Sequence, residues 1–201
     1  MSDTATISGK LTRIVQERFP QGVIATHQFR GQDTVLLKRE ALLEIAQFLK
    51  DDPGLAFDFL MDLTCVDYKS FGASSGSAPT LRTPSPLPYY MTSKITRESW
   101  ERLVDQDTYR FDMVYHMYSS RYSHRLRLKV PLTAVDPTVD SLTSLWHVAN
   151  WFEREVWDMF GVRFTGHPNL KRILMYESFV GHPLRKDYPI NKRQPLIGPV
   201  N

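Results

Sequence analysis

Cysteine is almost absent from this sequence, since Cys65 is the only one among 201 residues. One thiol cannot form an internal disulfide, which favours a reducing compartment. One thiolate also cannot hold an iron–sulfur cluster, because such clusters usually need about four cysteine ligands. We therefore expect no cluster in this chain and interpret Cys65 as a small residue of a buried strand.

Long apolar runs and glycine-rich nucleotide loops are missing as well. The most apolar stretch, 55–63, is broken by Asp58 and Asp62 and is far shorter than the roughly 20 residues that span a bilayer. Residues 1–10 have no apolar block after a basic stretch, so no signal peptide is expected. No dinucleotide or Walker-type motif occurs. The chain is expected to be soluble and to reach a membrane only through other proteins.

The composition is otherwise that of a folded domain, with 42% hydrophobic and 12% aromatic residues. Such a chain can bury a core, which argues against wholesale disorder. The net charge is +3, an excess too small to indicate a nucleic-acid partner by itself. The distribution of the charges along the chain is therefore more informative than their sum.

Apolar periodicity predicts an α+β fold, a two-layer sandwich with the order helix, two strands, helix, three strands, helix. In the last strand, Leu126, Leu128 and Val130 alternate with basic residues, as in a strand with one buried face. In the third strand, Phe57, Phe59, Met61 and Leu63 are expected to share the core face, although Leu60 falls on the other. The helices are expected from Thr4 or Ser8 to 19, at 39–50 and at 142–160, and the strands at 22–29, 33–37, 57–68, 109–118 and 124–132.

Two regions depart from this domain, which is expected to span residues 1–160. Residues 71–88 are rich in Ser, Gly, Ala and Pro and cannot bury enough surface to offset their ordering entropy. We therefore expect a flexible insertion at about 69–108, with a short helix at 96–106. Residues 161–201 show no sustained period and are expected to form an extended tail that binds a partner.

The helix expected at 142–160 is apolar on more than one side, which indicates burial against two neighbours. Tryptophans on such a helix are typical anchors of protein contacts. Its acidic residues could form a metal or catalytic set, but Glu153 and Glu155 are two positions apart and point in different directions. We favour ion pairs of Glu153, Glu155 and Asp158 with Arg154, Arg163 or basic residues of the tail, because buried carboxylates need partners.

The expected tail is cationic and apolar at once. From Gly161 onward it has seven Lys or Arg residues and only Glu177 and Asp187 as acids. His167 and His182 each precede a proline, and two imidazoles without a third ligand do not make a zinc site. Apolar residues between the cations would be exposed in a solvated tail, so an arm bound along a protein is expected, with nucleic acid as the alternative.

Several motifs together resemble the 30 kDa subunit family of respiratory complex I. The signature is carried by Glu153-Arg154-Glu155, Asp158-Met159-Phe160, His167, Lys171 and Ile173-Leu174. Flanking matches occur at 62–68, 114–119, 125–131 and 181–189, so the resemblance covers most of 62–189 except the insertion. The long insertion departs from the family pattern, and no fusion to a neighbouring subunit is expected.

The resemblance implies a cofactor-free subunit in the peripheral arm of a proton-translocating NADH:quinone oxidoreductase, without activity alone. FMN and the iron–sulfur clusters would lie in other subunits, and the D, B and I subunits would be the partners. The complex would lie at the inner membrane, with this chain peripheral on the cytoplasmic side. The alternative is the equivalent subunit of a related membrane-bound hydrogenase or other dehydrogenase complex. The expected interface residues are Trp146, Glu153, Arg154, Glu155, Trp157, His167, Arg172, His182, Arg185 and Lys186.

Overall fold

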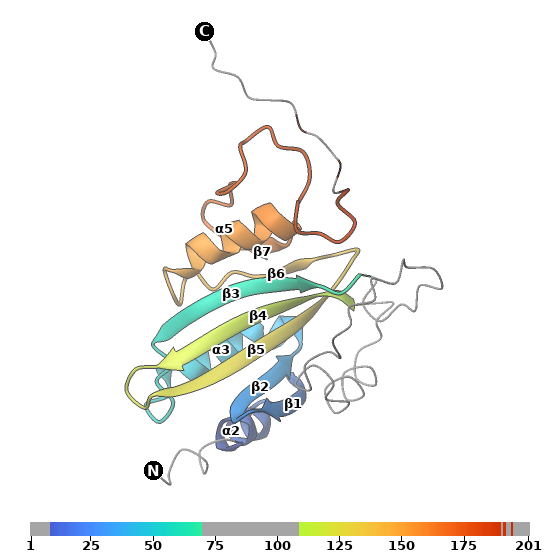
Figure 1. The fold of residues 1–201 in the computed structure, drawn as a ribbon. Helices are drawn as coiled ribbons and strands as arrows, with labels where there is room; N and C mark the ends of the chain where they lie inside the picture. Colours follow the sequence, from blue (N-terminus) through green and yellow to red (C-terminus); the bar gives the residue numbers. More distant parts are fainter. Residues whose placement is uncertain (1–8, 70–108, 190, 192–193, 195–201) are drawn as a thin grey trace, which may run out of the picture.

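The computed structural model describes residues 9–69, 109–189, 191 and 194 (Figure 1). The candidate helix caps Thr4 and Ser8, nearly all of the expected insertion and its short helix, and the chain from 195 onward lie outside the described residues. The predicted α+β class is confirmed. Among the described helices, none is long and apolar enough to cross a membrane.

A five-stranded sheet forms the centre of the fold, with the strand order β1-β2-β5-β4-β3. Strands β2 and β5 are parallel, and the other neighbours are antiparallel. The β1–β2 hairpin turns at Arg30 and Gly31, which both have positive φ, as a two-residue hairpin turn requires. The strands are β1 (Val23–Phe29), β2 (Gln32–Leu37), β3 (Phe59–Asp67), β4 (Tyr109–Ser119) and β5 (His124–Thr133).

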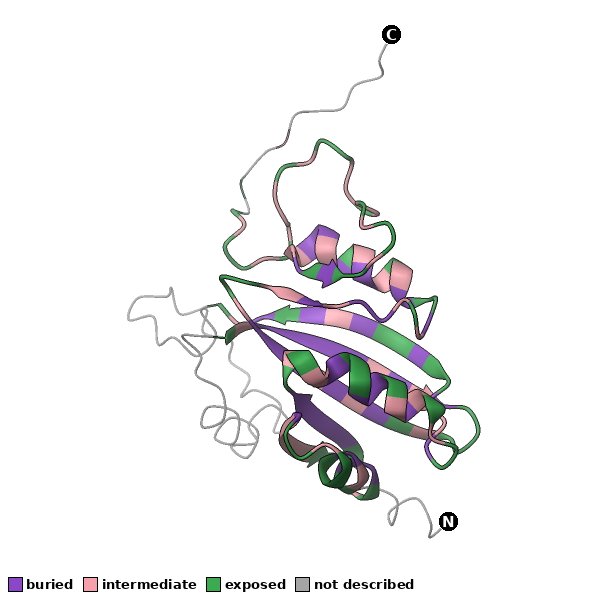
Figure 2. Ribbon diagram, turned by 180° about the vertical axis from the view of Figure 1, so that it is seen from behind, coloured by how far each residue is buried: buried purple, intermediate pink, exposed green. Residues whose placement is uncertain are grey.

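The helices pack on one face of this sheet and form a single core with it. Helix α3 lies across the sheet, and α5 lies beside β3 (Figure 2). The core combines Ile45 and Leu49 of α3 with Tyr115 of β4 and Val156 of α5. The helical elements are α2 (Lys10–Arg18), the 3₁₀ turn η1 (Arg39–Ala41), α3 (Leu42–Asp51) and α5 (Ala149–Phe160).

Strand β5 confirms the predicted alternation. Leu126, Leu128 and Val130 are buried in the core, while Arg125, Arg127 and Lys129 project from the second face, which is polar. The ladder places Arg127 beside His116 and Arg125 beside Tyr118 of β4. The two faces of the sheet therefore differ in chemistry, as the sequence pattern indicates.

Strand β3 corrects one expectation. Its register shifts between Leu60, which pairs with Met117, and Asp62, which pairs with His116, so Met61 is an extra residue in a β-bulge. Leu60 is fully buried, whereas Phe59 and Met61 are 52% and 37% exposed. The expected core positions of these two residues are wrong, because the bulge changes the phase of the alternation.

Helix α5 is shorter than expected and begins at Ala149 rather than at 142. Residues 142–148 form turns instead, in which Trp146 donates its backbone N–H to the Leu142 carbonyl. The Glu153 carboxylate accepts the Leu142 N–H and holds this segment back against the helix. The short strands β6 (Thr138–Asp140) and β7 (Arg163–Thr165) pair in parallel on either side of α5 in the sequence. They were not predicted, because three residues are too few to show alternation.

Candidate subunit interface

The most densely bonded polar region joins α5 to the chain that follows β7. We call residues 166–189 the ribbon; it has no helix or strand and loops over α5 (Figure 1). Its backbone groups have few partners in the ribbon itself and must be satisfied by side chains, as polar backbone groups generally are. Side chains from α5 and β3, together with Arg172 of the ribbon, supply several of these partners.

Asp158 is the centre of the first attachment. Its side chain is fully buried, and Oδ2 accepts the N–H groups of three successive ribbon residues, 173–175, at 2.9–3.1 Å. Its Oδ1 pairs with Arg172. Burial acts to raise the pKa of Asp158, but the backbone N–H donors and Arg172 outweigh it and lower the pKa. The predicted pairing of this acid with a basic tail residue is confirmed.

Arg172 extends this attachment across the ribbon loop. Its second guanidinium nitrogen donates to the carbonyls of Phe179 and Gly181 at 2.8 and 3.1 Å. The guanidinium also lies 5.6 Å from the ring centres of Trp157 and Phe179, a distance at which cation–π attraction acts. Arg172 thus connects the first part of the ribbon loop, at residue 172, to the part at residues 179–181 where the chain comes back to α5.

His182 and Gly161 form a close contact beneath the loop. The Nδ1 of His182 lies 3.0 Å from the Asp158 carbonyl, and its ring contacts Trp157 edge-on. Gly161 ends α5 with φ of 80°, a conformation that favours glycine. A Cβ there would lie 2.7 Å from the His182 ring. Glycine at this position therefore allows the helix to end with a positive φ and leaves space for the imidazole ring of His182.

Two further α5 contacts hold the start of the ribbon. Arg154 donates to the carbonyls of Lys171 and Arg172 at 3.2 and 3.1 Å. His167 Nδ1 accepts the Asn169 N–H, which leaves Nε2 to donate to the Asn150 carbonyl at 3.3 Å. These side chains bond the chain's own backbone, so the ribbon is attached along the length of α5.

An ion cluster forms the second attachment, which we call the clasp: Asp67, Arg110, Arg185 and Asp187. Arg110 makes a two-pronged contact with buried Asp67 at 2.6 and 2.9 Å and also pairs with Asp187 at 2.8 Å. Arg185 pairs with Asp187 at 3.1 Å. Asp67 additionally accepts the Lys186 N–H. The clasp joins the ends of β3 and β4 to the far end of the ribbon.

The clasp shifts the protonation of both acids. The Arg110 and Arg185 guanidinium groups hold the pKa of Asp187 far below its usual range. Burial acts to raise the pKa of Asp67, but the Arg110 bonds and two backbone N–H donors outweigh it and lower the pKa. Both carboxylates are therefore charged at neutral pH, and the attachment is ionic.

Glu153 is different, because its partners are neutral. It is fully buried and accepts the Ser141 hydroxyl and the Leu142 N–H, both at 2.7 Å. Burial raises its pKa to about 7 against the opposing effect of these two bonds. The expected pairing of Glu153 with an arginine is wrong: the residue holds the 141–142 turn to α5.

The outer side of α5 and the ribbon carries exposed apolar groups. Trp151, Leu174, Val180 and Leu184 are 60%, 58%, 62% and 51% exposed. Arg154 lies 5.2 Å from the Trp151 ring centre. Exposed apolar groups gathered on one fixed element are typical of protein interfaces. This side can therefore offer a prearranged surface to another protein.

The predicted interface residues fall into three groups. Trp146 and Glu153 are buried within the chain and are not available to a partner in this conformation. Glu155 is exposed and forms no ion pair with a described residue. The rest contact the chain's own ribbon and clasp, and whether they also contact a partner stays a prediction; they are Arg154, Trp157, His167, Arg172, His182, Arg185 and Lys186.

Sequence reasoning missed Asp67, Arg110 and Asp187 as functional residues, as well as exposed Trp151. Within the clasp, Arg110 and Asp187 are 77 positions apart, and no local pattern signals such a pairing. Trp151 lies in the signature helix, where helical spacing from buried Ala149 and Val156 would have placed it outward.

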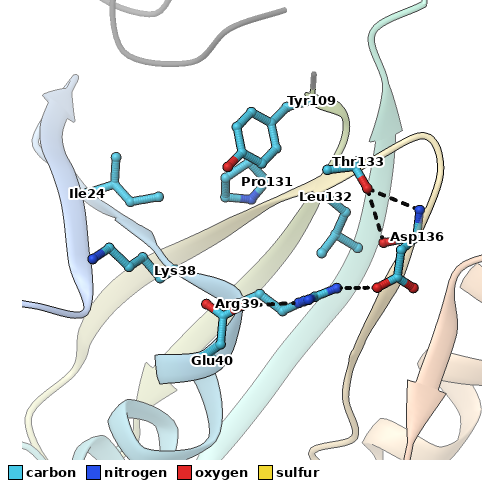
Figure 3. A pocket seen from close by; sticks show the side chains of 9 residues that line it. All are labelled: Ile24, Lys38, Arg39, Glu40, Tyr109, Pro131, Leu132, Thr133 and Asp136. Atoms are coloured by element: carbon cyan, nitrogen blue, oxygen red, sulfur yellow. Dashed lines mark hydrogen bonds and ion pairs between the residues drawn. The ribbon is translucent and has the colours of Figure 1, made fainter. Parts of the chain in front are cut away.

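Two other polar features of the described residues are a surface hollow and a buried thiol. A hollow of about 550 Å³ lies beside η1 and β5 (Figure 3), but there Arg39 and Asp136 pair with each other at 2.7 Å. No cluster of three or more metal-binding side chains occurs in the described part of the chain. Cys65 is buried, and burial raises the pKa of its thiol, which makes it a poor nucleophile.

Known proteins resemble this chain over most of its length. The family model for the respiratory-chain NADH dehydrogenase 30 Kd subunit matches residues 35–194. A relative from Citrifermentans bemidjiense is 39% identical over 186 residues, or 92% of each chain. One from Roseiflexus castenholzii is 37% identical over 192 residues, which is 96% of this chain and 87% of the relative. Both are named as the C subunit of an NADH-quinone oxidoreductase.

Solved structures agree with the sequence comparison. A structure described as a trypsin-resistant fragment of Nqo5 is 28% identical with a TM-score of 0.52, and the match covers 80% of this chain and 99% of the fragment. A chain of the membrane-bound sulfane sulfur reductase, an archaeal respiratory membrane complex, has a TM-score of 0.61 over 91% and 86% of the two chains. At 14% identity this second likeness shows the fold alone. The resemblance seen in the sequence is thus confirmed, and the chain belongs to the 30 kDa subunit family of the respiratory-chain NADH dehydrogenase, or complex I.

Proposed function

We propose that this chain is a cofactor-free structural subunit of the peripheral arm of a proton-translocating NADH:quinone oxidoreductase. One observation carries the proposal: a ribbon without regular structure is pinned by buried ion pairs, while three of its apolar side chains, Leu174, Val180 and Leu184, are more than half exposed. An isolated protein gains nothing from ordering Leu174, Val180 and Leu184 in water, because ordering costs entropy and no apolar surface is buried. A partner that covers them would supply the missing burial.

The partners that fit this role are the D, B and I subunits, with FMN and the iron–sulfur clusters held outside this chain. The single cysteine and the absence of a metal-binding cluster among the described residues support this division of labour. The chain would be peripheral, on the cytoplasmic side of the inner membrane, and held there by these partners. Its contribution to electron transfer to quinone would be to fix the positions of the subunits that hold the redox groups.

Paired substitutions on the exposed surface test the proposal. Trp151→Ser with Leu184→Ser removes two apolar groups that support no core contact, so the isolated chain should keep its unfolding midpoint. Loss of two interface anchors, each worth about 2 kcal/mol, should lower the amount of assembled complex in membranes and its NADH:quinone activity. Val135→Ser is the control, since Val135 is 96% exposed and lies outside α5 and the ribbon in the sequence. Normal amounts of assembled complex in the double variant would refute the role of this surface.

The related membrane-bound hydrogenase or other dehydrogenase complex is the second candidate, and the fold shared with the sulfane sulfur reductase chain supports it. The two candidate complexes differ in the subunits that accept electrons from the donor, because oxidation of NADH requires a subunit that binds FMN. Purification of the tagged chain in mild detergent should recover a flavin-bearing subunit with bound FMN under the first proposal. Recovery of a stable complex with no such subunit would favour the second.

A further inference from the structure

A second exposed apolar surface lies at the other end of β3 and β4 from the clasp. We call it the turn-end surface: Phe29, Arg30, Phe59, Met61, Tyr118, Arg121, Tyr122 and Arg125. The turns β1–β2 and β4–β5 and the start of β3 meet there, at the end where β5 begins. Phe59 lies about 25 Å from Asp67 at roughly 3.3 Å per strand residue, so this surface is separate from the clasp.

The bulge in β3 creates the centre of this surface. Because Met61 is an extra residue, it projects outward with Phe59 instead of entering the core. Together with Tyr118 and Arg125 they line a hollow of about 460 Å³. Bulges are typically retained where they redirect a side chain. Exposing two large apolar residues has no benefit for the folding of the isolated chain.

Side chains of the turn-end surface and of its hollow are held in place before any partner binds. Tyr122 donates its hydroxyl to the Pro53 carbonyl at 2.7 Å and stacks on His124. The Asp58 carboxylate accepts the backbone N–H and the hydroxyl of Ser120, which fixes the β4–β5 turn. Anchors that are already ordered lose little entropy on binding.

The charge of the surface indicates the chemistry of its partner. Arg30, Arg121 and Arg125 lie 5.2–5.8 Å from the ring centres of Phe29, Tyr122 and Tyr118. Arg127 lines a second hollow, of about 350 Å³, together with Arg125 and Met61, and its buried Nε has no hydrogen-bond partner among the described residues. The nearby exposed acids are Asp58, held by Ser120, and Asp62. Asp33 also lines this second hollow, but it is buried and accepts the Gly9 N–H and the Gln28 amide. The four arginines therefore outnumber the two exposed aspartates and Asp33.

We propose that the turn-end surface docks an acidic segment with apolar side chains from a neighbouring subunit; this rests on the proposed function. Phe59 and Met61 would be covered by the apolar groups, and Arg125 and Arg127 would bind carboxylates. Arg and aromatic residues with Met are the types enriched at protein interfaces. A single-stranded nucleic acid could contact the arginines and the aromatic rings, but its bases and phosphates would not require Met61 or an apolar hollow.

Photo-crosslinking in the assembled complex tests the proposal. The probe p-benzoylphenylalanine replaces Phe59 in one strain and Val135 in the control strain, and adducts are mapped by mass spectrometry in purified membranes. We expect Phe59 to crosslink to one other subunit, within a segment containing Asp or Glu, and Val135 not to do so. Arg125→Glu should lower that yield at least about tenfold, whereas Arg125→Lys should retain most of it.

The outcomes separate this inference from the proposed function. If the complex assembles but Phe59 gives no adduct, or one to a neutral segment, to nucleic acid or to residues 70–108 of the same chain, the turn-end surface is not the proposed dock. An unchanged yield with Arg125→Glu would also overturn it. If the chain is absent from any assembled complex, the proposed function fails and the inference fails with it.

Discussion

Replacing Asp158 by Asn should release the ribbon while leaving the sheet intact. The carboxylate uses one oxygen for three N–H groups and the other for Arg172. An amide has one accepting oxygen, so its NH₂ group would face either the backbone donors or the guanidinium. The Arg172 side chain is only 14% exposed, so water would restore little of the lost interaction. Removing one partner of a buried pair costs about 3–5 kcal/mol, and retained backbone bonds favour the lower value.

That cost should appear as local opening, because Asp158 connects the ribbon to α5 rather than the sheet to α3. A change of about 3 kcal/mol corresponds to roughly a hundredfold in an opening equilibrium. Hydrogen exchange of the amides at 173–175 should therefore accelerate by about this factor, and trypsin should cleave after Arg172 sooner. Glu155→Gln on the exposed side of the same helix is the matched control. If exchange at 173–175 changes less than about threefold, Asp158 does not hold the ribbon.

Three further predictions concern the clasp, the buried acid and the helix end. The pKa of Asp187 is lowered in the folded state, so its stabilising effect is present above its unfolded pKa of 3.8 and is lost as the pH falls below it. Arg110→Met should weaken that acid dependence in an unfolding titration, with Arg185 left to hold the remainder. Glu153 has a raised pKa of about 7, so it favours folding fully below pH 4.5 and loses about 3 kcal/mol as the pH rises to 7. Glu153→Gln should flatten this slope in chemical denaturation and leave the variant more stable at pH 8. Gly161→Ala should lower stability by about 2 kcal/mol, because φ is positive and the new Cβ meets the His182 ring, and an unchanged unfolding midpoint would contradict this.

Patterns within a few residues predicted the parts of the fold that depend on local chemistry. The alternation in β5 and the hairpin before Leu37 follow from side-chain polarity and turn residues, which act over two to four positions. The pairing of Asp158 with a tail cation could also be predicted, since a buried acid needs a partner and the following chain is cationic. Each of these inferences depends on the chemistry of the residues themselves and does not require knowledge of which distant residues they contact.

The parts that were not predicted depend on contacts between distant residues. The bulge at Met61 arises from pairing with β4, which is more than 40 residues away and beyond the insertion. Helix α5 begins late because the Glu153 carboxylate captures the Leu142 N–H, an interaction that competes with helix formation but leaves the apolar pattern unchanged. The position of Trp146 in the core follows from that turn. Where apolar periodicity gave a wrong prediction, hydrogen bonds between distant residues had changed the local backbone structure.

The strand pair β3–β4 connects the clasp to the turn-end surface. The clasp attaches the ribbon where β3 ends at Asp67, and the turn-end surface begins at Phe59, so the same hydrogen-bonded ladder separates them. This ladder packs on the core formed with α3 and α5 and deforms little, because protein interiors are closely packed. A cofactor-free subunit, as proposed above, would influence electron transfer through the distances between the redox groups that its partners hold. A stiff pair of strands with a contact surface at each end would set such a distance.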